Sequence, residues 1–484
     1  MSGIRHRLST TWGEFLNETS LHGCKNIVTK QHGPVKRTLW FLCLGIMVGT
    51  LTYTTCTFYM KYMEYDFKTK ASVRYQRKLE FPAVTICNLH PLDENDFNKS
   101  DPILFDRENL NKSDPLLLDG ENIDKLNPLL LEYLEQLLSS PPTLNASDSK
   151  WELFRPKVSD LNKLGFRFDD MILEVYLNGQ LLLKPESQFS VSFRGPIEKC
   201  FTFNDRYYNE THHHKPLMFQ ANDIMALVLD TKQDRYAFAS LTAGVRLILH
   251  RPDEPFHTLS PSIRLSPGYY HQIKVSEKRY KYLSSPYNSY QNQDCLHVDK
   301  PHQGFGEYRP PYSHASCVIH CLTNRTQSLC GCIIESLHHD NSSVFCTVAK
   351  RHSCALDIWD SYFNNASSDF SDCIKPCLEI KYDYELSSVL FRPRKLLTSI
   401  TDYSSLIYVT ISFKDTAVTT TSHEPEFDFG DIISQLGGYM GFCVGASVLT
   451  LVELIEAVLK SLKAARLHRY LLVNMSKETK PNPV

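Results

Sequence analysis

Two long apolar runs, one near each end of the chain, dominate its pattern of hydrophobic and polar residues. The first, Thr38–Met60, has 23 residues and no charged side chain. As a helix it would extend about 34 Å, which matches a bilayer core of about 30 Å. The second, Asp431–Leu459, has 29 residues, with acidic side chains only at Asp431, Glu453 and Glu456. The pattern therefore predicts two membrane spans.

The charges at the two ends predict how these spans are oriented. Residues 1–37 hold six basic and two acidic side chains, and residues 460–484 hold six and one. Because basic residues gather on the cytoplasmic side, both ends are expected to be cytosolic tails and residues 61–430 an extracellular domain. We therefore expect a multi-pass plasma-membrane protein with spans over residues 38–60 and 431–459. A cleaved signal peptide fits the first run poorly, since its apolar core would be shorter and nearer the start.

Residues 61–430 have the features of a secreted domain. They hold 11 of the 15 cysteines, nine of them within residues 295–377, which is typical of a disulfide-stapled subdomain outside the cell. Zinc is the alternative, but the CxxxC and CxC spacings differ from those of zinc knuckles. The same region holds seven glycosylation sequons, at Asn98, Asn111, Asn145, Asn209, Asn324, Asn341 and Asn365.

The expected fold is an α+β membrane protein, with two transmembrane helices flanking a disulfide-rich outer domain. Alternating apolar residues predict strands over residues 188–203, 224–230, 243–250, 269–275 and 405–413, which suggest a central β-sheet. An apolar stripe over residues 122–139 predicts a peripheral helix, and further helices are expected around the cysteine cluster.

Composition removes several classes of function. The net charge of −2 provides no global basic field, so no nucleic-acid partner is expected. The sequence has no G-x-S-x-G, H-E-x-x-H or P-loop motif, so an enzyme is not expected, and neither a cofactor nor a metal is predicted. Two spans around a glycosylated domain leave three classes: a channel, a two-span lipid or scavenger-type receptor, and a tethered ectoenzyme.

The second apolar run favours the channel. A carboxylate in a lipid-facing helix costs about 2.5–3.5 kcal/mol, yet Glu453 and Glu456 lie in this run. Gly437, Gly441 and Gly445 recur at every fourth position, a spacing that lets helices approach closely. A simple dimer face would leave the carboxylates unexplained. Several copies around an axis would instead turn carbonyls at the Gly-Ala-Ser break toward a water-filled path, above an acidic ring that attracts cations.

Four motifs are spread along nearly the whole chain. They are His22-Gly23 before the first span, FPAVTICN at residues 81–88, the spaced cysteines, and Gly445-Ala446-Ser447 followed by Leu449, Thr450 and Glu453. In this combination the chain resembles the degenerin, epithelial sodium channel and acid-sensing ion channel superfamily, especially its acid-sensing and peptide-gated invertebrate members. The resemblance implies a ligand-gated sodium channel of three identical or related subunits, commonly blocked by amiloride, with a hand-like outer domain.

The resemblance also implies roles for individual residues. The selectivity filter and pore would consist of Gly445, Ala446, Ser447 and Glu453. The gate would involve Ser434, Gly437, Gly438, His22 and Gly23, and glycine at position 23 is expected to adopt the positive φ that it alone tolerates well. Tyr65 and Tyr287 match the aromatic contact at the wrist, although acid-sensing channels usually have Trp at the latter position.

Five disulfides and one remaining thiol are implied in the same way. The implied pairs are Cys87–Cys200, Cys295–Cys377, Cys317–Cys373, Cys330–Cys354 and Cys332–Cys346. Cys321 is left over, because Ser371 stands where the family usually has Cys. Each bridge would stabilise the fold by about 2–4 kcal/mol.

Two stimuli are compatible with these residues. Asp253, Glu254, Asp357 and Asp360 match the acidic-pocket positions of acid-sensing channels, where crowded carboxylates raise a pKa toward mildly acidic pH. They are the proton-sensing candidates, and ordinary surface acids paired with basic side chains are the alternative. Gating by an extracellular neuropeptide is the competing hypothesis.

The histidines bear on this choice. Asp66-Phe67 replace the His pair that follows the wrist Tyr in many proton-gated members. The run His212, His213 and His214 is either a substitute sensor, since an ordinary His titrates near 6.5, or a solvated loop.

Overall fold

The computed structural model describes most of the chain. The described residues are 12–16, 18–28, 33–90, 92–94, 165–194, 198–206, 216–236, 242–256, 260–287, 294–297, 312–334, 345–346, 350–364, 373–392 and 403–478. The predicted helix over 122–139, the three consecutive histidines at 212–214 and every sequon except Asn324 lie outside them. The chain divides into two compact units, one with residues 1–68, 286–289 and 424–484, and the other with 69–285 and 290–423.

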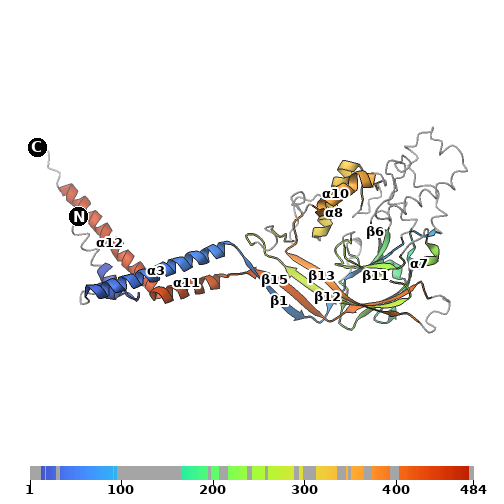
Figure 1. The fold of residues 1–484 in the computed structure, drawn as a ribbon, viewed down its shortest axis with the longest axis horizontal. Coiled ribbons are helices and arrows are strands. Elements are labelled where there is room, and N and C mark those ends of the chain that lie inside the picture. The colour runs from blue at the N-terminus through green and yellow to red at the C-terminus, as the bar shows by residue number, and fades with distance from the viewer. Residues whose placement is uncertain are drawn as a thin grey trace. The chain divides into compact units, whose positions relative to one another are not determined.

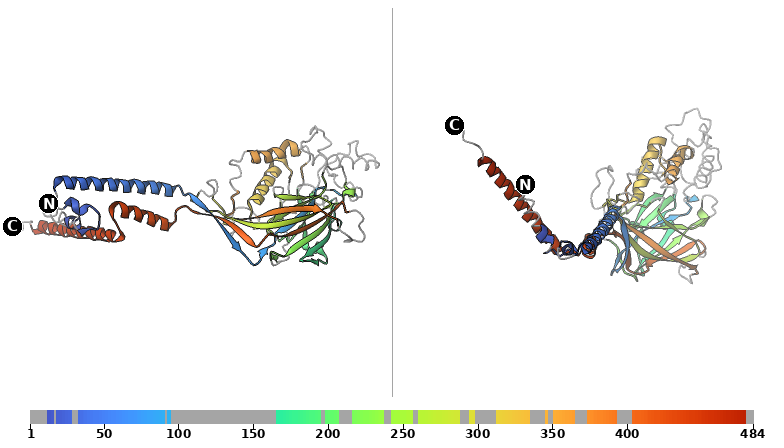
Figure 2. Two further views of the ribbon diagram at one scale, coloured as in Figure 1. Left: turned by 60° about the horizontal axis from the view of Figure 1, so that its bottom comes forward. Right: turned by 60° about the vertical axis from the view of Figure 1, so that its left-hand side comes forward.

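Helices build the first unit. They are α2 (Cys24–Val28), α3 (Pro34–Met63), α11 (Phe429–Val444) and α12 (Val448–Glu478). α3 is long and apolar enough to cross a membrane, and it contains the whole of the predicted span over 38–60. α11 packs along α3 (Figures 1 and 2), and the rings of Phe58 and Phe427 meet edge to face with centroids 5.1 Å apart.

The second apolar run is broken rather than continuous. α11 ends at Val444, α12 begins at Val448, and the two helices are bent by 74° at the break. The described residues therefore contain one helix able to cross a membrane, or two candidates if the bent pair is one span. Hydropathy predicts a single run over 431–459 because it does not register a bend of the backbone within apolar residues.

A large mixed sheet forms the centre of the second unit. Its strands run in the order β1-β15-β12-β14-β9-β4-β5, with β13 paired to β12 as a branch. β12 is antiparallel to β13 along its whole length and parallel to β14 and β15. The strands are β1 (Phe67–Tyr75), β4 (Ile172–Leu177), β5 (Gln180–Leu181), β9 (Ile224–Asp230), β12 (Tyr269–Lys281), β13 (Leu378–Leu390), β14 (Leu406–Phe413) and β15 (Ala417–Pro425).

A second sheet has five strands in the order β11-β10-β3-β7-β6. These are β3 (Ala83–Asn88), β6 (Phe189–Arg194), β7 (Glu198–Phe203), β10 (Val245–His250) and β11 (Ser262–Leu265); β2 (Leu79–Glu80) and β8 (Met218–Phe219) form a separate pair. Every residue of β3 is buried, which explains its nearly continuous apolar sequence. One apolar core holds residues of both sheets, among them Val84, Phe201, Ile273 and Ile411.

The predicted strands are all present, with two differences in extent. The segment 188–203 forms two antiparallel strands, β6 and β7, rather than one. β12 continues to Lys281, beyond the apolar alternation that ends at residue 275, because its outer half pairs with the largely exposed β13. The sequence of this half, SEKRYK at residues 276–281, is polar apart from Tyr280, so it lacks the apolar alternation on which the prediction depends.

Short helices and disulfides complete the second unit. The helices are α7 (Phe168–Met171), η2 (Pro185–Gln188), η3 (Gln233–Arg235), α8 (His314–Cys330), η4 (Arg351–Ala355) and α10 (Leu356–Asn364). α8 and α10 pack around a small core that includes Val318, Leu322 and Trp359. The five disulfides are Cys87–Cys200, Cys295–Cys377, Cys317–Cys373, Cys330–Cys354 and Cys332–Cys346, the same pairs that the resemblance implies.

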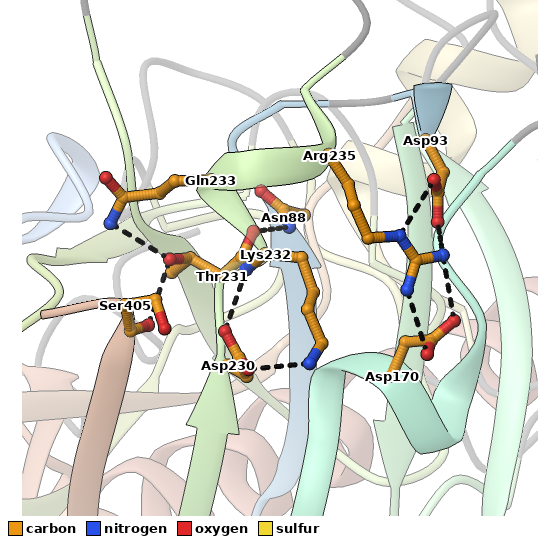
Figure 3. Close-up of polar contacts among 9 residues, drawn as sticks. All are labelled: Asn88, Asp93, Asp170, Asp230, Thr231, Lys232, Gln233, Arg235 and Ser405. Carbon is orange, nitrogen blue, oxygen red and sulfur yellow. Dashed lines mark hydrogen bonds and ion pairs between the residues drawn. The ribbon is translucent and has the colours of Figure 1, made fainter. Parts of the chain in front are cut away.

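A polar network ties together strand ends of the two sheets (Figure 3). Asn88 Nδ2, at the end of β3, donates to the Thr231 carbonyl at 3.0 Å, and Thr231 Oγ1 donates to the Ser405 carbonyl at 2.9 Å. Nearby, Arg235 pairs with Asp93, whose side chain is fully buried, and with Asp170 on α7 at 3.0 Å. Burial alone would lower the pKa of Arg235, but hydrogen bonds to the two carboxylates raise it.

Candidate functional site

Three small residues, Gly445, Ala446 and Ser447, form the break between α11 and α12. Gly445 caps α11 with φ +67°, and its N–H donates to the Gly441 carbonyl at 3.0 Å. Ser447 starts α12, because its N–H donates to Thr450 Oγ1 at 3.0 Å while its Oγ accepts from the Thr450 N–H at 3.4 Å. The motif thus encodes a helix stop and a helix start in three consecutive residues.

The His22-Gly23 turn packs against this break. The His22 N–H donates to the Val444 carbonyl, the last of α11, at 3.0 Å. Gly23 has φ +86°, the left-handed conformation that glycine adopts without strain. A Cβ added to Gly445 would lie 2.4 Å from His22 Nδ1, which is closer than any real contact. Two segments from opposite ends of the chain therefore fit together because position 445 has no side chain.

Glu453, six residues beyond the break, is bound by residues shortly before His22. Its Oε2 accepts from Thr19 Oγ1 at 3.1 Å and from the Ser20 N–H at 3.2 Å. Ser20 Oγ also lies 2.6 Å from Thr450 Oγ1. Sequence reasoning identified Glu453 but missed Thr19 and Ser20. Two hydroxyl residues separated from the His-Gly turn by Leu21 alone were the available signal, and nothing in their spacing says which carboxylate they meet.

A face of small residues on α11 is exposed. Ser434, Gly437 and Gly438 are exposed, and a Cβ added to either glycine would have no atom within 4 Å. Positions i, i+3 and i+4 lie on one side of a helix, so these three residues form one continuous strip. Such a strip permits close approach of another helix backbone.

The two tyrosines predicted at the wrist are in contact. Tyr65 directly follows the cap of α3 and has φ +52°. Its ring meets that of Tyr287 edge to face, with centroids 5.8 Å apart and an interplanar angle of 90°. Aromatic pairs in this geometry contribute about 0.5–1.5 kcal/mol beyond their buried area.

In the second unit, Asp253 and Glu254 share one arginine. They lie in the turn after β10, where Arg251 donates to Asp253 Oδ2 at 2.8 Å and to Glu254 Oε1 at 3.4 Å. About a quarter of each acidic side chain is exposed, 27 % for Asp253 and 23 % for Glu254. The pair is therefore neither a free surface cluster nor fully enclosed.

Glu254 faces a cavity of about 520 Å³. Arg251 and Glu254 line it from the turn after β10, and His314 lines it from the start of α8. The segment before β13 and β13 itself contribute Lys375, Glu379, Lys381 and Asp383. The cavity thus gathers charges of both signs from three parts of the chain that are far apart in sequence.

Burial raises the pKa of Glu254 to about 7. Arg251 opposes this rise, while the negative charges of Asp253 and Glu379 add to it. The carboxyl therefore changes its charge in the mildly acidic range, whereas an ordinary Glu titrates near 4.3. This is the electrostatic property expected of a proton-binding group.

His250 fixes the turn that carries Glu254. Its Nδ1 lies 2.9 Å from the carbonyl oxygens of both Arg251 and Glu254, and its Nε2 lies 2.8 Å from Thr85 Oγ1. Burial lowers the pKa of His250, partly offset by the charge of Asp205. A neutral ring with its proton on Nδ1 satisfies these contacts, because two carbonyls can only accept. Sequence reasoning missed this residue, which reads as an ordinary strand-end histidine.

Neither Asp357 nor Asp360 lines this cavity. Both are exposed on α10, and no hydrogen bond or ion pair among the described residues joins them to Asp253 or Glu254. In this single chain the four proton-sensing candidates therefore form two separate pairs.

Asn324, the one sequon that is described, is exposed on α8, as glycosylation requires.

The described residues contain one group with the makings of a metal site. Sγ atoms of Cys317, Cys321 and Cys373 lie within 4.8 Å of one another. Cys317 and Cys373 form a disulfide, however, so neither sulfur is a thiolate available to a metal. The cluster is therefore a disulfide beside a thiol and not a metal site.

Apolar helices with a Gly-Ala-Ser break, joined to a disulfide-stapled β domain, are compatible with the ion channel that the sequence predicts. The family model of the amiloride-sensitive sodium channels matches residues 15–457, and the chain belongs to this family. Members of the family are channels of the plasma membrane. The expectation that the chain is not an enzyme follows from this membership, and the receptor alternative loses its support.

Curated relatives are similar over nearly the whole chain. Acid-sensing ion channel 1 of Gallus gallus is 25% identical over 482 residues, covering 93% of this chain and 84% of the relative. Acid-sensing ion channel 2 of Homo sapiens is 25% identical over 482 residues, covering 93% and 86%. Acid-sensing ion channel 4-B of Danio rerio is 24% identical over 465 residues, covering 92% and 75%.

A solved structure of a proton-activated chloride channel also matches. Its sequence identity is 6% and its TM-score 0.33, over 89% of this chain and 98% of that one. A likeness this weak supports no inference, and the assignment depends on the family match alone.

Proposed function

We propose that this chain is a subunit of a sodium-selective cation channel that extracellular protons open. Three identical or related copies would surround the pore, with both termini in the cytosol, residues 61–430 outside the cell, and amiloride as a blocker. The observation that carries proton gating is Glu254, a cavity-lining carboxyl whose pKa is raised to about 7.

The pore half of the proposal is supported by the first unit. The strip of Ser434, Gly437 and Gly438 is exposed in the single chain and would face other copies across the axis. Beyond it, the backbone at Gly445, Ala446 and Ser447 leaves the helical pattern. The Ser447 carbonyl accepts from the Leu451 N–H at 3.3 Å, so the carbonyls of Gly445 and Ala446 are the ones that would bind a permeating cation. Glu453 then provides negative charge six residues further along, held in place by Thr19 and Ser20.

The gating half depends on the sign of the charge change at Glu254. Because its pKa is raised, the ionised form is disfavoured wherever the side chain is enclosed. Falling pH converts it to the neutral acid, which weakens its attraction to Arg251 and removes its repulsion of Asp253 and Glu379. Acidification therefore favours conformations in which the cavity closes around Glu254, and that closure is the proposed trigger.

Recording currents from cells that express only this chain tests the proposal. Glu254→Gln mimics the protonated acid, so we expect half-maximal activation to move to higher pH by roughly 0.5–1 pH unit, or about 0.7–1.4 kcal/mol. Glu186→Gln is the matched control, because this carboxylate is exposed and is not one of the proton-sensing candidates, so the activation curve should be unchanged. An unchanged curve in Glu254→Gln, with robust acid currents, would remove Glu254 as the sensor.

Gating by a peptide remains the second candidate, and the size of the cavity favours it. A volume of about 520 Å³ lies within the 300–1,000 Å³ typical of ligand sites. Glu254, Glu379 and Asp383 would suit a basic group of such a ligand. Application of a neuropeptide panel at constant pH 7.4 distinguishes the two hypotheses. Currents evoked by a peptide, with none on acidification, would mean that the agonist is a peptide and not protons.

A further inference from the structure

Three sulfur atoms meet where α8 contacts the segment before β13. Cys317 and Cys321 lie one turn apart on α8, and Cys373 lies shortly before β13. Cys317 and Cys373 are joined in a disulfide, while Cys321 carries a thiol. Sγ of Cys321 lies 3.6 Å from Sγ of Cys373. A thiol is therefore in van der Waals contact with a disulfide of its own chain.

The surroundings limit the access of dissolved thiols to that disulfide, whereas Cys321 is already in contact with it. Cys317 and Cys373 are each only 3% exposed, so a dissolved thiol has little access to the bond between them. Cys321 is half-buried and packs against the same small core. A group that can be reached from solvent thus lies directly beside a bond that cannot.

We propose that Cys317, Cys321 and Cys373 form an internal thiol–disulfide exchange site. The Cys321 thiol loses its proton to solvent, and the thiolate attacks Sγ of Cys373. A Cys321–Cys373 bond forms as the Cys317–Cys373 bond breaks, and Cys317 leaves as a thiolate that takes up a proton. One disulfide and one thiol are present before and after, so no external oxidant or reductant is consumed.

Geometry selects Cys373 as the sulfur that is attacked. A Cys317–Cys321 bond would join positions i and i+4 of a helix, whose Cβ atoms are about 5–6 Å apart, whereas a disulfide needs about 3.5–4.5 Å. The Cys321–Cys373 sulfurs must approach by only about 1.5 Å to reach an ordinary bond length. A thiolate attacks in line with the bond that breaks, which would place Sγ of Cys321 and Sγ of Cys317 on opposite sides of Cys373. The three sulfurs all lie within 4.8 Å of one another, which is too close for that arrangement. A rotation of the Cys321 or Cys373 side chain therefore precedes the attack.

Exchange would change how α8 is attached to the large sheet. The bond to Cys373 moves by one helical turn, about 6 Å along the axis of α8. Cys373 is followed by Cys377, which is bonded to Cys295, and then directly by β13. The two isomers therefore hold α8 in different registers against the start of β13. The proposal stands apart from proton gating, since it needs no charge at Glu254.

Locating the thiol in the intact channel tests this proposal. Full-length protein is purified without reductant, held at pH 8 for minutes to hours, denatured in acid to stop exchange, and alkylated. Uncatalysed disulfide rearrangement takes minutes to hours. Fragmentation spectra of the peptide that contains both Cys317 and Cys321 then locate the label. We expect label on both residues, with the share on Cys317 rising over time; label that stays on Cys321 alone would overturn the proposal.

Two variants keep the test decisive. Cys321→Ser removes the attacking thiol, and label on Cys317 should fall at least tenfold. Cys317→Ser leaves Cys321 and Cys373, which should then be found as a disulfide in non-reducing peptide maps. Cys321 and Cys373 both alkylated in that variant would contradict the geometry. Cys330–Cys354 and Cys332–Cys346 serve as internal controls and should remain intact throughout.

Discussion

The helix break at residues 445–447 and the acidic turn after β10 are both small sites, but the sequence encodes them differently. At the break, what matters is an absent atom: Gly445 has no side chain where His22 packs. At the turn, what matters is which charges meet. Arg251 opposes the rise in the pKa of Glu254, while Asp253 and Glu379 add to that rise. A steric site can be disabled by adding one methyl group. A charge site changes only when a partner or the pH changes.

The largest loss of stability is expected at a buried ion pair that has no proposed role in proton sensing. Asp93 has a fully buried side chain, and Arg235 pairs with it (Figure 3). Arg235→Ala leaves this carboxylate buried without its cation, a change that costs about 3–5 kcal/mol. We expect the variant to lose most of its delivery to the cell surface, measured by biotinylation.

Asp170→Asn is the matched control for that variant. Asp170 binds the same arginine at 3.0 Å, but 30% of its side chain is exposed. Its loss should cost well under half as much as the loss of Arg235. Equal damage from both variants would show that burial of Asp93 is not what makes the network important.

The next largest effect is expected at the break. Gly445→Ala places a methyl group where φ is +67° and where His22 Nδ1 would be 2.4 Å away. The left-handed backbone costs about 1–2 kcal/mol and the overlap about 1–3 kcal/mol more. We expect loss of current with a lower melting temperature of the purified channel.

Two further variants separate strain from overlap. Gly45→Ala lies in the middle of α3 with nothing within 4 Å, so it should leave the channel as stable as before or slightly more so. His22→Ala combined with Gly445→Ala removes the overlapping ring but keeps the strained φ, and should restore only part of the lost stability. Full restoration would mean that the backbone conformation is not strained.

Sequence reasoning was accurate where local chemistry decides the structure. Strands over 224–230 and 243–250 were predictable because buried strands have dense apolar sequences. The resemblance of the His22-Gly23 turn implied a positive φ at Gly23, and the structure has φ +86° there. The break at Gly445 was visible as a motif, but the 74° bend and the fit of His22 were not, because both depend on a segment from the other end of the chain.

The partners of charged and polar side chains were harder to predict from the sequence. Asp253 and Glu254 were identified by motif, yet Arg251, which binds both, lies only a few residues away and was not recognised as their partner. His250 and Ser20 were missed because their partners come from β3 and α12. No pattern within a single segment records such contacts between distant segments.

A smaller effect, on pH dependence, sharpens the contrast between the two sites. Glu254 has a raised pKa, so it adds stability as pH falls from about 7 toward its ordinary value. His250 has a lowered pKa, so it removes stability as pH falls below about 6.5. The two contributions oppose each other. In Glu254→Gln the opposing contribution is lost, while His250 still removes stability, as do His271 and His314, whose pKa values burial also lowers. The melting temperature should therefore fall more steeply between pH 7.5 and 5.5 than in the wild type. An identical slope would indicate that Glu254 does not titrate in this range.

The smallest effect is expected where a hydroxyl holds Glu453. Ser20→Ala removes the 2.6 Å contact with Thr450 Oγ1 and a longer one with Glu453, but keeps the backbone N–H that binds Glu453 at 3.2 Å. One such hydrogen bond contributes about 0.5–1.5 kcal/mol, so a slightly lower melting temperature is expected. Thr52→Ala is the control, because its hydroxyl bonds only the Val48 carbonyl of its own helix. If both variants behave alike, the N-terminal segment does not support Glu453, and the break is held by the fit of His22 alone.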